Sequence, residues 1–162
     1  MRSFIAGIAV CVVAVATSGA AQEGKASTHV LLTSAELKWG PAPPALPKGG
    51  MAVVLSGDPG KPGPFALRLK FPAGYKIAPH WHPTDEQVTV LTGTMALGMG
   101  EKFDQAVMKT VRTGGYALLP AEMRHFAMAR TAAIIEVHGM GPFVLNYVNP
   151  ADDPSKANSP QE

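Results

Sequence analysis

The spacing of glycine and proline limits the possible folds of this chain more than any other feature. The sequence contains 17 Gly and 15 Pro residues without a collagen-like period, and many of them separate short apolar segments between residues 51 and 148. No segment of ten or more residues carries a helical hydrophobic period. The pattern therefore predicts an all-β fold, in which many short strands and tight turns form an antiparallel sandwich or barrel.

The expected strands are short apolar segments bounded by turn residues. They are Ala52–Leu55, Phe65–Phe71, Tyr75–Pro79, Gln87–Thr92, Met95–Met99, Val107–Val111, Tyr116–Leu119, His125–Ala129, Ala132–His138 and Phe143–Val148. A further candidate, His29–Leu32, precedes the Pro-rich stretch Trp39–Pro47, which is typical of an extended loop. We expect residues 22–50 to form an N-terminal strand and a Pro-rich loop, residues 51–148 to form the barrel, and residues 149–162 to form a flexible tail.

The N-terminus has the pattern of an export signal. Arg2 supplies a positive charge, Phe4–Ala16 contains no charged residue, and Thr17–Ala21 consists of small residues. This order is typical of a secretory signal peptide, and the apolar stretch is shorter than the roughly 20 residues of a transmembrane helix. We expect removal of residues 1–21, a periplasmic or secreted protein and no stable membrane anchor. A buried N-terminal helix or an uncleaved anchor is the alternative.

Cysteine content and charge exclude several classes of protein. Cys11 is the single cysteine, so the chain has no disulfide framework and no cysteine-based zinc site. The formal net charge is only +2, and the basic residues are scattered singly along the chain. Nucleic acid is therefore not an expected partner.

Three histidines and one glutamate have the spacing of a metal site. His80 and His82 are two residues apart, and alternate residues of a strand point to the same face. Glu86 follows after a short turn, and His125 comes directly after another turn. Three neutral imidazoles and a carboxylate suit a divalent metal ion of borderline hardness. Mn, Fe, Co, Ni, Cu and Zn all satisfy this donor set.

The same residues lie in two motifs that resemble those of the cupin superfamily. The first cupin motif is Gly, five residues, His-x-His, three or four residues, Glu, six residues and Gly. Its fixed positions are filled here by Gly74, His80, His82, Glu86 and Gly93. The first motif is therefore complete.

The second cupin motif is filled in part. It consists of Gly, five residues, Pro-x-Gly, two residues, His, three residues and Asn. Gly114, Pro120 and His125 match it, whereas Glu122 replaces the second Gly and Ala129 replaces the Asn. The departures leave the histidine in place. The resemblance covers residues 51–148, and the short gap between the motifs is similar to that of compact single-domain bacterial cupins.

The resemblance implies a double-stranded β-helix, or jelly-roll, barrel. It also implies one divalent metal ion inside the barrel, held by His80, His82, Glu86 and His125. Cupins with this ligand set include dioxygenases, decarboxylases, isomerases and lyases, and other cupins are non-catalytic binding modules. We expect an exported protein that acts on or binds a small molecule at this site. Whether it is an enzyme or a periplasmic small-molecule or metal binder is left open. Because small cupins often pair, we also expect a homodimer, with His29–Leu32 as the segment that could be exchanged.

Other polar residues have weaker links to the site. Tyr116 could transfer a proton near the metal. Arg68 and Arg124 could hold a carboxylate, although solvated charge at a strand edge is the simpler interpretation. Glu136 and His138 share one strand face, which points either toward the metal or outward.

Overall fold

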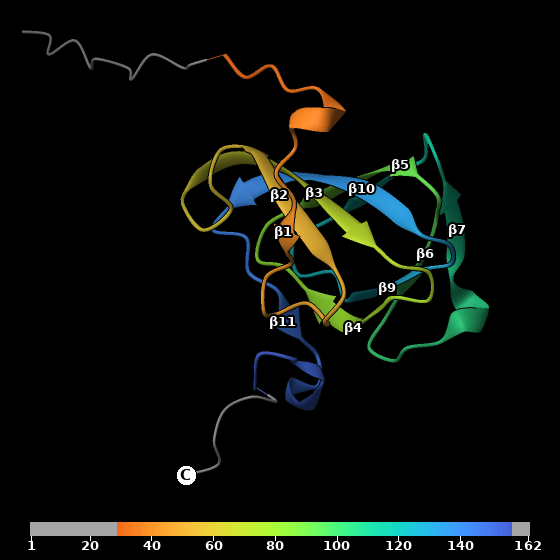
Figure 1. The fold of residues 1–162 in the computed structure, drawn as a ribbon. Helices are drawn as coiled ribbons and strands as arrows, with labels where there is room; N and C mark the ends of the chain where they lie inside the picture. The colour runs from red at the N-terminus through yellow and green to blue at the C-terminus, as the bar shows by residue number, and fades with distance from the viewer. Residues whose placement is uncertain (1–28, 157–162) are drawn as a thin grey trace, which may run out of the picture.

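The computed structural model describes residues 29–156, which form a barrel of short strands (Figure 1). The strands are β1 Gly40–Pro41, β2 Met51–Ser56, β3 Gly63–Phe71, β4 Lys76–Trp81, β5 Glu86–Thr92, β6 Thr94–Met99, β7 Lys109–Arg112, β8 Tyr116–Leu119, β9 His125–Ala129, β10 Ala133–Gly141 and β11 Asn146–Tyr147. Three 3-10 turns, η1 Ser34–Glu36, η2 Gln105–Val107 and η3 Pro150–Asp152, complete the assignment. The all-β prediction is confirmed.

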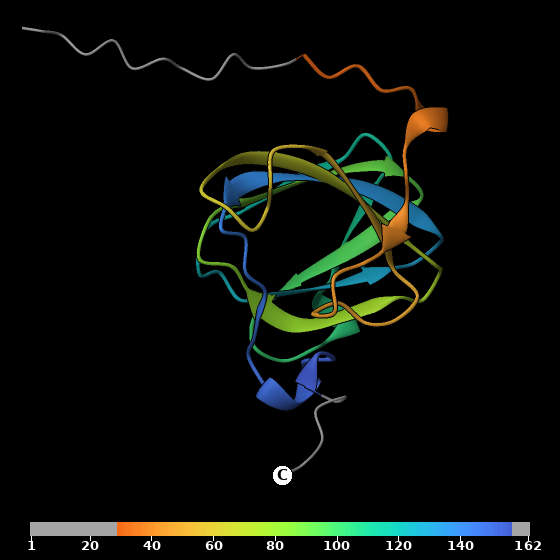
Figure 2. The same ribbon diagram turned by 60° about the vertical axis from the view of Figure 1, so that its left-hand side comes forward.

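Two antiparallel sheets face each other across the barrel. The six-stranded sheet has the order β1-β2-β3-β10-β5-β8, and the five-stranded sheet has the order β11-β4-β9-β6-β7. In Figure 2, β3 and β10 lie in the upper layer, and β4 and β9 lie in the lower layer. Consecutive strands β4 and β5 belong to different sheets, as do β8 and β9. The connections between these pairs are therefore corners of the barrel.

Alternating burial along the strands places the core between the two sheets. On β3, Phe65, Leu67, Leu69 and Phe71 are buried, while the residues between them are only partly buried. This period of two is expected for strands with one face toward the core. Val137 of β10 faces the same interior and is 1% exposed. The barrel thus has an apolar core to which the histidines do not belong.

The predicted N-terminal strand His29–Leu32 is wrong. Residues 29–33 take part in no strand of the described chain, and their Val30 and Leu31 side chains are exposed. The first strand is β1, inside the stretch that was predicted as a loop, and Pro41 pairs with Met51. A proline, which lacks an N–H group, fits such an edge position. The segment expected for strand exchange is therefore not a strand, and the homodimer stays a prediction without that support.

Three further differences from the predicted strand ends are informative. The predicted strand 107–111 begins as the turn η2, and the predicted strand 143–148 is reduced to β11. Strand β10 continues through Gly141, which was expected in a turn, because its pairing with β3 extends to Gly63. Pairing between distant strands thus decided where these elements end.

The ends of the chain add two observations. The predicted signal peptide, residues 1–21, and residues 157–162 of the predicted tail lie outside the described residues. The part of the chain from 29 to 156 contains no helix that is long and apolar enough to cross a membrane.

Candidate metal centre

Strand pairing brings the two sequence motifs together. Strand β4 pairs with β9, and His80 lies directly opposite His125 in this register. Strand β5 pairs with β8, which places Glu86 opposite Leu119. The two barrel corners, 82–85 and 120–124, therefore lie at the same end of the molecule.

Hydrogen bonds between the corners fix their relative position. The backbone N–H of Glu122 donates to the carbonyl oxygen of His82 at 2.8 Å. The backbone N–H of Ala121 donates to the carboxylate of Asp85, also at 2.8 Å. Each corner thus holds the other, so the motif residues are oriented by contacts between segments almost 40 residues apart.

A bulge in β4 sets the direction of the first two histidines. The pairing of β4 with β9 shifts between Ile77 and His80, with Pro79 inside the shift, where a missing N–H is tolerated. Both Ile77 and His80 consequently line the barrel cavity, although they are three residues apart. His82, two residues beyond His80, lines the cavity as well. The prediction that the two histidines share a face is confirmed.

The departure from the second cupin motif does not change the turn before His125. Glu122 has φ of 63°, in the left-handed region that favours glycine. This conformation costs a non-glycine residue roughly 1–2 kcal/mol. The Arg124 guanidinium donates to the backbone carbonyl of Glu122 at 2.7 Å and supports the turn. Glutamate has therefore taken the conformation that the motif assigns to glycine.

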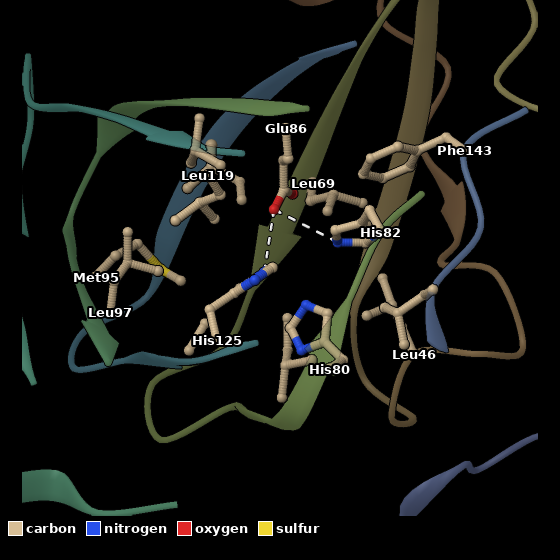
Figure 3. Close-up of a pocket in the computed structure, with 15 residues that line it drawn as sticks. Leu46, Leu69, His80, His82, Glu86, Met95, Leu97, Leu119, His125 and Phe143 are labelled. Carbon is tan, nitrogen blue, oxygen red and sulfur yellow. Dashed lines mark ion pairs between the residues drawn. The ribbon is translucent and has the colours of Figure 1, made fainter. Parts of the chain in front are cut away.

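Three imidazole rings converge inside the barrel (Figure 3). One ring nitrogen from each of His80, His82 and His125 lies within 4.8 Å of the others. The three residues are only 2–3% exposed. The rings of His80 and His125 are 4.2 Å apart between centroids, as their direct pairing across the strands requires.

The backbone fixes the tautomer of each histidine. The Nδ1–H of His80 donates to Ala78, that of His82 to Val144 and that of His125 to Met123, at 2.7, 2.8 and 2.9 Å. Because a carbonyl oxygen can only accept, the proton of each neutral ring must be on Nδ1, which leaves a lone pair on Nε2. Metal-bound histidines are held in the same way, through their second nitrogen. The Phe143 ring stacks on His82 at 4.1 Å between centroids and restricts it further.

Glu86 lies beside two of these rings. Its Oε2 atom is 3.3 Å from Nε2 of His125 and 3.5 Å from Nε2 of His82, as the dashed lines in Figure 3 mark. Burial by itself raises the pKa of this carboxyl, and the lone pairs on the two Nε2 atoms offer it no proton. A cation placed between these three atoms would hold the carboxylate in its ionised form.

His80 remains neutral. Burial, together with the neighbouring His125 and His82 rings, lowers the pKa of His80 to about 3 against the opposing effect of Glu86. Neutral imidazole is the form that binds metal ions.

Two buried atoms lack a partner that a metal ion would supply. Within the described residues, Nε2 of His82 and Nε2 of His125 are buried without a hydrogen-bond partner. The nearby Glu86 oxygen does not satisfy them, since an ionised carboxylate has no proton to donate. Buried polar atoms without a partner are rare in native proteins. A cation that accepts both lone pairs and contacts the carboxylate fits this arrangement.

The cavity beside these residues has a volume of about 60 Å³ and is otherwise apolar. The six-stranded sheet contributes Leu69, Val88, Leu119 and Ile135, and the five-stranded sheet contributes Ile77, Met95, Leu97 and Ala127. Leu46, Phe143 and Leu145 complete the lining from segments outside the central strands. The described lining residues thus include no lysine, arginine, hydroxyl or amide side chain.

The Leu46 contribution was not predicted from the sequence. Leu46 belongs to residues 42–50, here named the strap, which connect β1 to β2. The Tyr147 hydroxyl donates to the carbonyl of Ala45 at 2.7 Å, and the Tyr75 hydroxyl donates to that of Pro47. Both residues next to Leu46 are therefore tied to the barrel. An isolated leucine in a Pro-rich stretch was the only local signal for this role.

The remaining sequence candidates lie outside the cavity. Arg68 Nε and His138 Nε2 contact the two carboxylate oxygens of Glu136 at 2.7 and 2.8 Å on the outer face of the six-stranded sheet. The face of Glu136 and His138, left open by the sequence, is thus the outward one. Tyr116 is 57% exposed and donates to the side chain of Gln87, so it has no contact with the histidine cluster.

Arg124 does not enter the cavity either. Its guanidinium lies 5.5 Å from the centre of the Trp81 ring, and its side chain is 44% exposed. The simpler interpretation, a solvated charge, thus agrees with the structure for Arg124. Arg68 also lies outside the cavity, but it is on the interior strand β3 in a partly buried ion pair with Glu136, so it is not a solvated charge at a strand edge.

Comparisons with solved structures support the fold. The polyketide cyclase RemF from Streptomyces resistomycificus is 17% identical, with a TM-score of 0.66 over 82% of this chain and 95% of that chain. An acetylacetone dioxygenase from Acinetobacter johnsonii is 16% identical, with a TM-score of 0.63 over 85% and 88%. An RmlC-like cupin from Shewanella frigidimarina is 15% identical, with a TM-score of 0.55 over 70% and 91%. No protein-family model and no curated protein matches the chain.

These likenesses show which fold the chain adopts. The chain has the jelly-roll barrel of the cupins, as its two motifs implied. Within that barrel, three histidines are placed where they could bind a metal ion. The protein therefore has a cupin-like fold with a candidate metal centre.

Proposed function

We propose that this protein is an exported metalloenzyme that transforms a small molecule. His80, His82, His125 and Glu86 hold one divalent metal ion in the cavity, and the small molecule binds beside them. The observation that carries the proposal is the pair of buried Nε2 atoms without partners, aimed at the same space as a carboxylate.

The donor set supports a reactive site over a purely structural one. Four protein donors leave positions of a six-coordinate ion for other molecules, and such an ion supplies Lewis-acid or, if it is redox-active, oxygen-dependent chemistry. The protein residues orient the imidazoles through backbone carbonyls, and the apolar walls exclude bulk water. Polar interactions with the substrate are stronger in such surroundings than in water.

Oxygen-dependent chemistry is the first activity to test. One similar structure is that of a dioxygenase, although the likeness itself extends only to the fold. The full-length protein is loaded with Fe²⁺, and oxygen consumption is measured with a set of small organic acids and ketones. Turnover with one of them supports the enzyme. Metal-dependent binding without turnover of any of them would favour the alternative, a non-catalytic binding module.

The metal assignment is tested by elemental analysis of protein purified without a metal-affinity tag. Wild type and His138→Ala, a control on the outer face, are expected to hold about one equivalent of metal. His82→Ala is expected to lose it. Stoichiometric metal in His82→Ala would show that the proposed ligand set is wrong.

Export is supported only by the N-terminal sequence pattern and has its own test. The intact mass of the protein recovered from its native host should lack residues 1–21. A retained Met1–Ala21 segment would contradict the proposal.

A further inference from the structure

We propose that the cavity binds a small monoanion with an apolar body, and that Leu46 limits the size of that ligand. This inference rests on the metal site proposed above. Its three supports are the charge of the site, the chemistry of the walls and the volume enclosed by the strap.

The charge of the site calls for one negative charge on the ligand. A metal ion binds neutral imidazole and ionised carboxylate, so the proposed ligands bring three neutral donors and one negative charge. A divalent ion bound to them leaves one positive charge uncompensated. The described cavity lining holds no second charged side chain, and an unpaired charge in apolar surroundings is costly. A ligand with a single negative charge removes this cost.

The walls restrict the rest of the ligand. A second anionic group would contact aliphatic side chains such as Leu69 and Leu97, without a cation to pair with. A hydroxyl or amide would lose its hydrogen bonds to water, because no described lining side chain except those of the metal centre can replace them. Dicarboxylates, phosphate esters and sugars are therefore disfavoured, and an apolar body is favoured.

The volume restricts the size. A single water molecule needs about 10–15 Å³ of such a cavity. The volume of about 60 Å³ therefore equals that of roughly four to six water molecules, including the space of the ion. Because bonded atoms overlap, a short-chain acid such as butyrate fits this space, and a longer chain does not. Leu46 forms part of the boundary on the side of His80 and His82 (Figure 3). The hydrogen bonds from Tyr147 and Tyr75 to Ala45 and Pro47 keep it there.

The charge requirement is tested on the full chain loaded with Co²⁺, whose visible spectrum responds to a new ligand. The probes are butyrate, its neutral analogue butyramide and succinate, in which a carboxylate replaces the terminal methyl group of butyrate. Butyrate is expected to change the spectrum with a Kd at least tenfold below those of the other two. Equal binding of succinate or butyramide would overturn the inference.

The size requirement is tested with hexanoate. Wild type is expected to bind hexanoate at least tenfold more weakly than butyrate, and Leu46→Ala is expected to remove most of this difference. Leu118→Ala, the same substitution on the exposed outer face of β8, should behave as wild type. A second variant, Leu46→Phe, should weaken butyrate itself. If Leu46→Ala and Leu118→Ala have the same ratio of the hexanoate Kd to the butyrate Kd, Leu46 does not limit the size of the ligand.

Failure of the two proposals can be told apart. Protein that holds no Co²⁺ would overturn the proposed metal site together with this inference. Protein that holds Co²⁺ but does not distinguish the probes would overturn this inference alone.

Discussion

Each imidazole of the metal centre has one nitrogen committed to the backbone and the other directed into the cavity. The carbonyls of Ala78, Met123 and Val144 that accept from Nδ1 come from both motif segments and from the chain before β11. No side chain is needed to set the tautomers. The roles of individual residues can therefore be tested without disturbing a wider side-chain network.

Acid should destabilise the metal-free protein through His80. Its pKa is about 3 in the folded chain against an ordinary value of 6.5, so the unfolded chain binds more protons between these values. The contribution of His80 to the unfolding free energy is therefore complete above about pH 6.5. It decreases as the pH falls toward 3, by up to about 1.4 kcal/mol per pH unit.

Urea denaturation of the metal-free protein at pH 7.5, 6 and 5 measures this dependence. The unfolding free energy of His80→Gln, whose side chain cannot titrate, should decrease less than that of wild type between pH 7.5 and 5. Equal slopes for the two proteins would contradict the assignment to His80.

Glu86→Gln separates charge from coordination. The amide oxygen can still coordinate, so this variant should weaken metal binding less than His82→Ala, which removes a nitrogen donor. Competition with a chelator of known affinity gives both dissociation constants. A Glu86→Gln variant that binds metal as weakly as His82→Ala would show that the negative charge dominates the site.

At the scale of elements, the two glycines of the first motif share a backbone conformation but differ in their surroundings. Gly74 and Gly93 have φ of 80° and 77°, in the left-handed region that favours glycine. A Cβ atom on Gly74 would meet open space. A Cβ on Gly93 would overlap the carbonyl oxygen of Ala132 and lie 2.9 Å from Cα of Ala133. Gly74→Ala should cost roughly 1–2 kcal/mol of unfolding free energy for the conformation alone. Gly93→Ala should cost about 1–3 kcal/mol more for the overlap.

Chemical denaturation of both glycine variants gives the comparison directly. If the two substitutions lower the unfolding free energy equally, backbone conformation alone explains both glycines. The close approach of Gly93 to Ala132 and Ala133 would then not contribute.

The strap should depend on the Tyr147 hydroxyl. Burial raises the pKa of Tyr147, so the phenol remains a donor to Ala45 at all ordinary pH values. Tyr147→Phe should remove about 0.5–1.5 kcal/mol of stabilisation and accelerate hydrogen exchange at the amide of Leu46. Tyr116→Phe, which removes an exposed hydroxyl bonded to Gln87, is the control. Unchanged exchange in Tyr147→Phe would show that the strap is held by other contacts.

At the scale of the whole molecule, the barrel should persist without metal. Its core combines buried apolar residues of the six-stranded sheet, such as Phe65 and Val90, with those of the five-stranded sheet, such as Ile77 and Met95. It therefore does not depend on an ion as a zinc finger does. Metal should add only its binding free energy, roughly 2.7 kcal/mol at a hundredfold excess over the dissociation constant. Removal by a chelator should therefore lower the melting temperature and leave the circular dichroism of strands nearly unchanged. Loss of that signal would make the site structural.

The class of fold and the residue types of the candidate metal centre could be predicted from the sequence. Turn residues between short apolar segments predicted the strands, because these signals act over a few residues. The period of a strand predicted that His80 and His82 share a face, and the short turn after them predicted that Glu86 lies nearby. The direction of Glu136 and His138 could not be obtained this way, since it depends on which face of β10 meets the core.

The contacts around the candidate metal centre could not be predicted from the sequence. The partners of the Nδ1 atoms, the pairing of His80 with His125 and the position of Leu46 all depend on contacts between distant segments. The strap shows this most clearly, because a Pro-rich stretch has no periodic signal, and its place over the cavity is set by two tyrosines far along the chain. Local sequence signals therefore predicted the residues of the candidate site, and packing between distant segments decided what surrounds them.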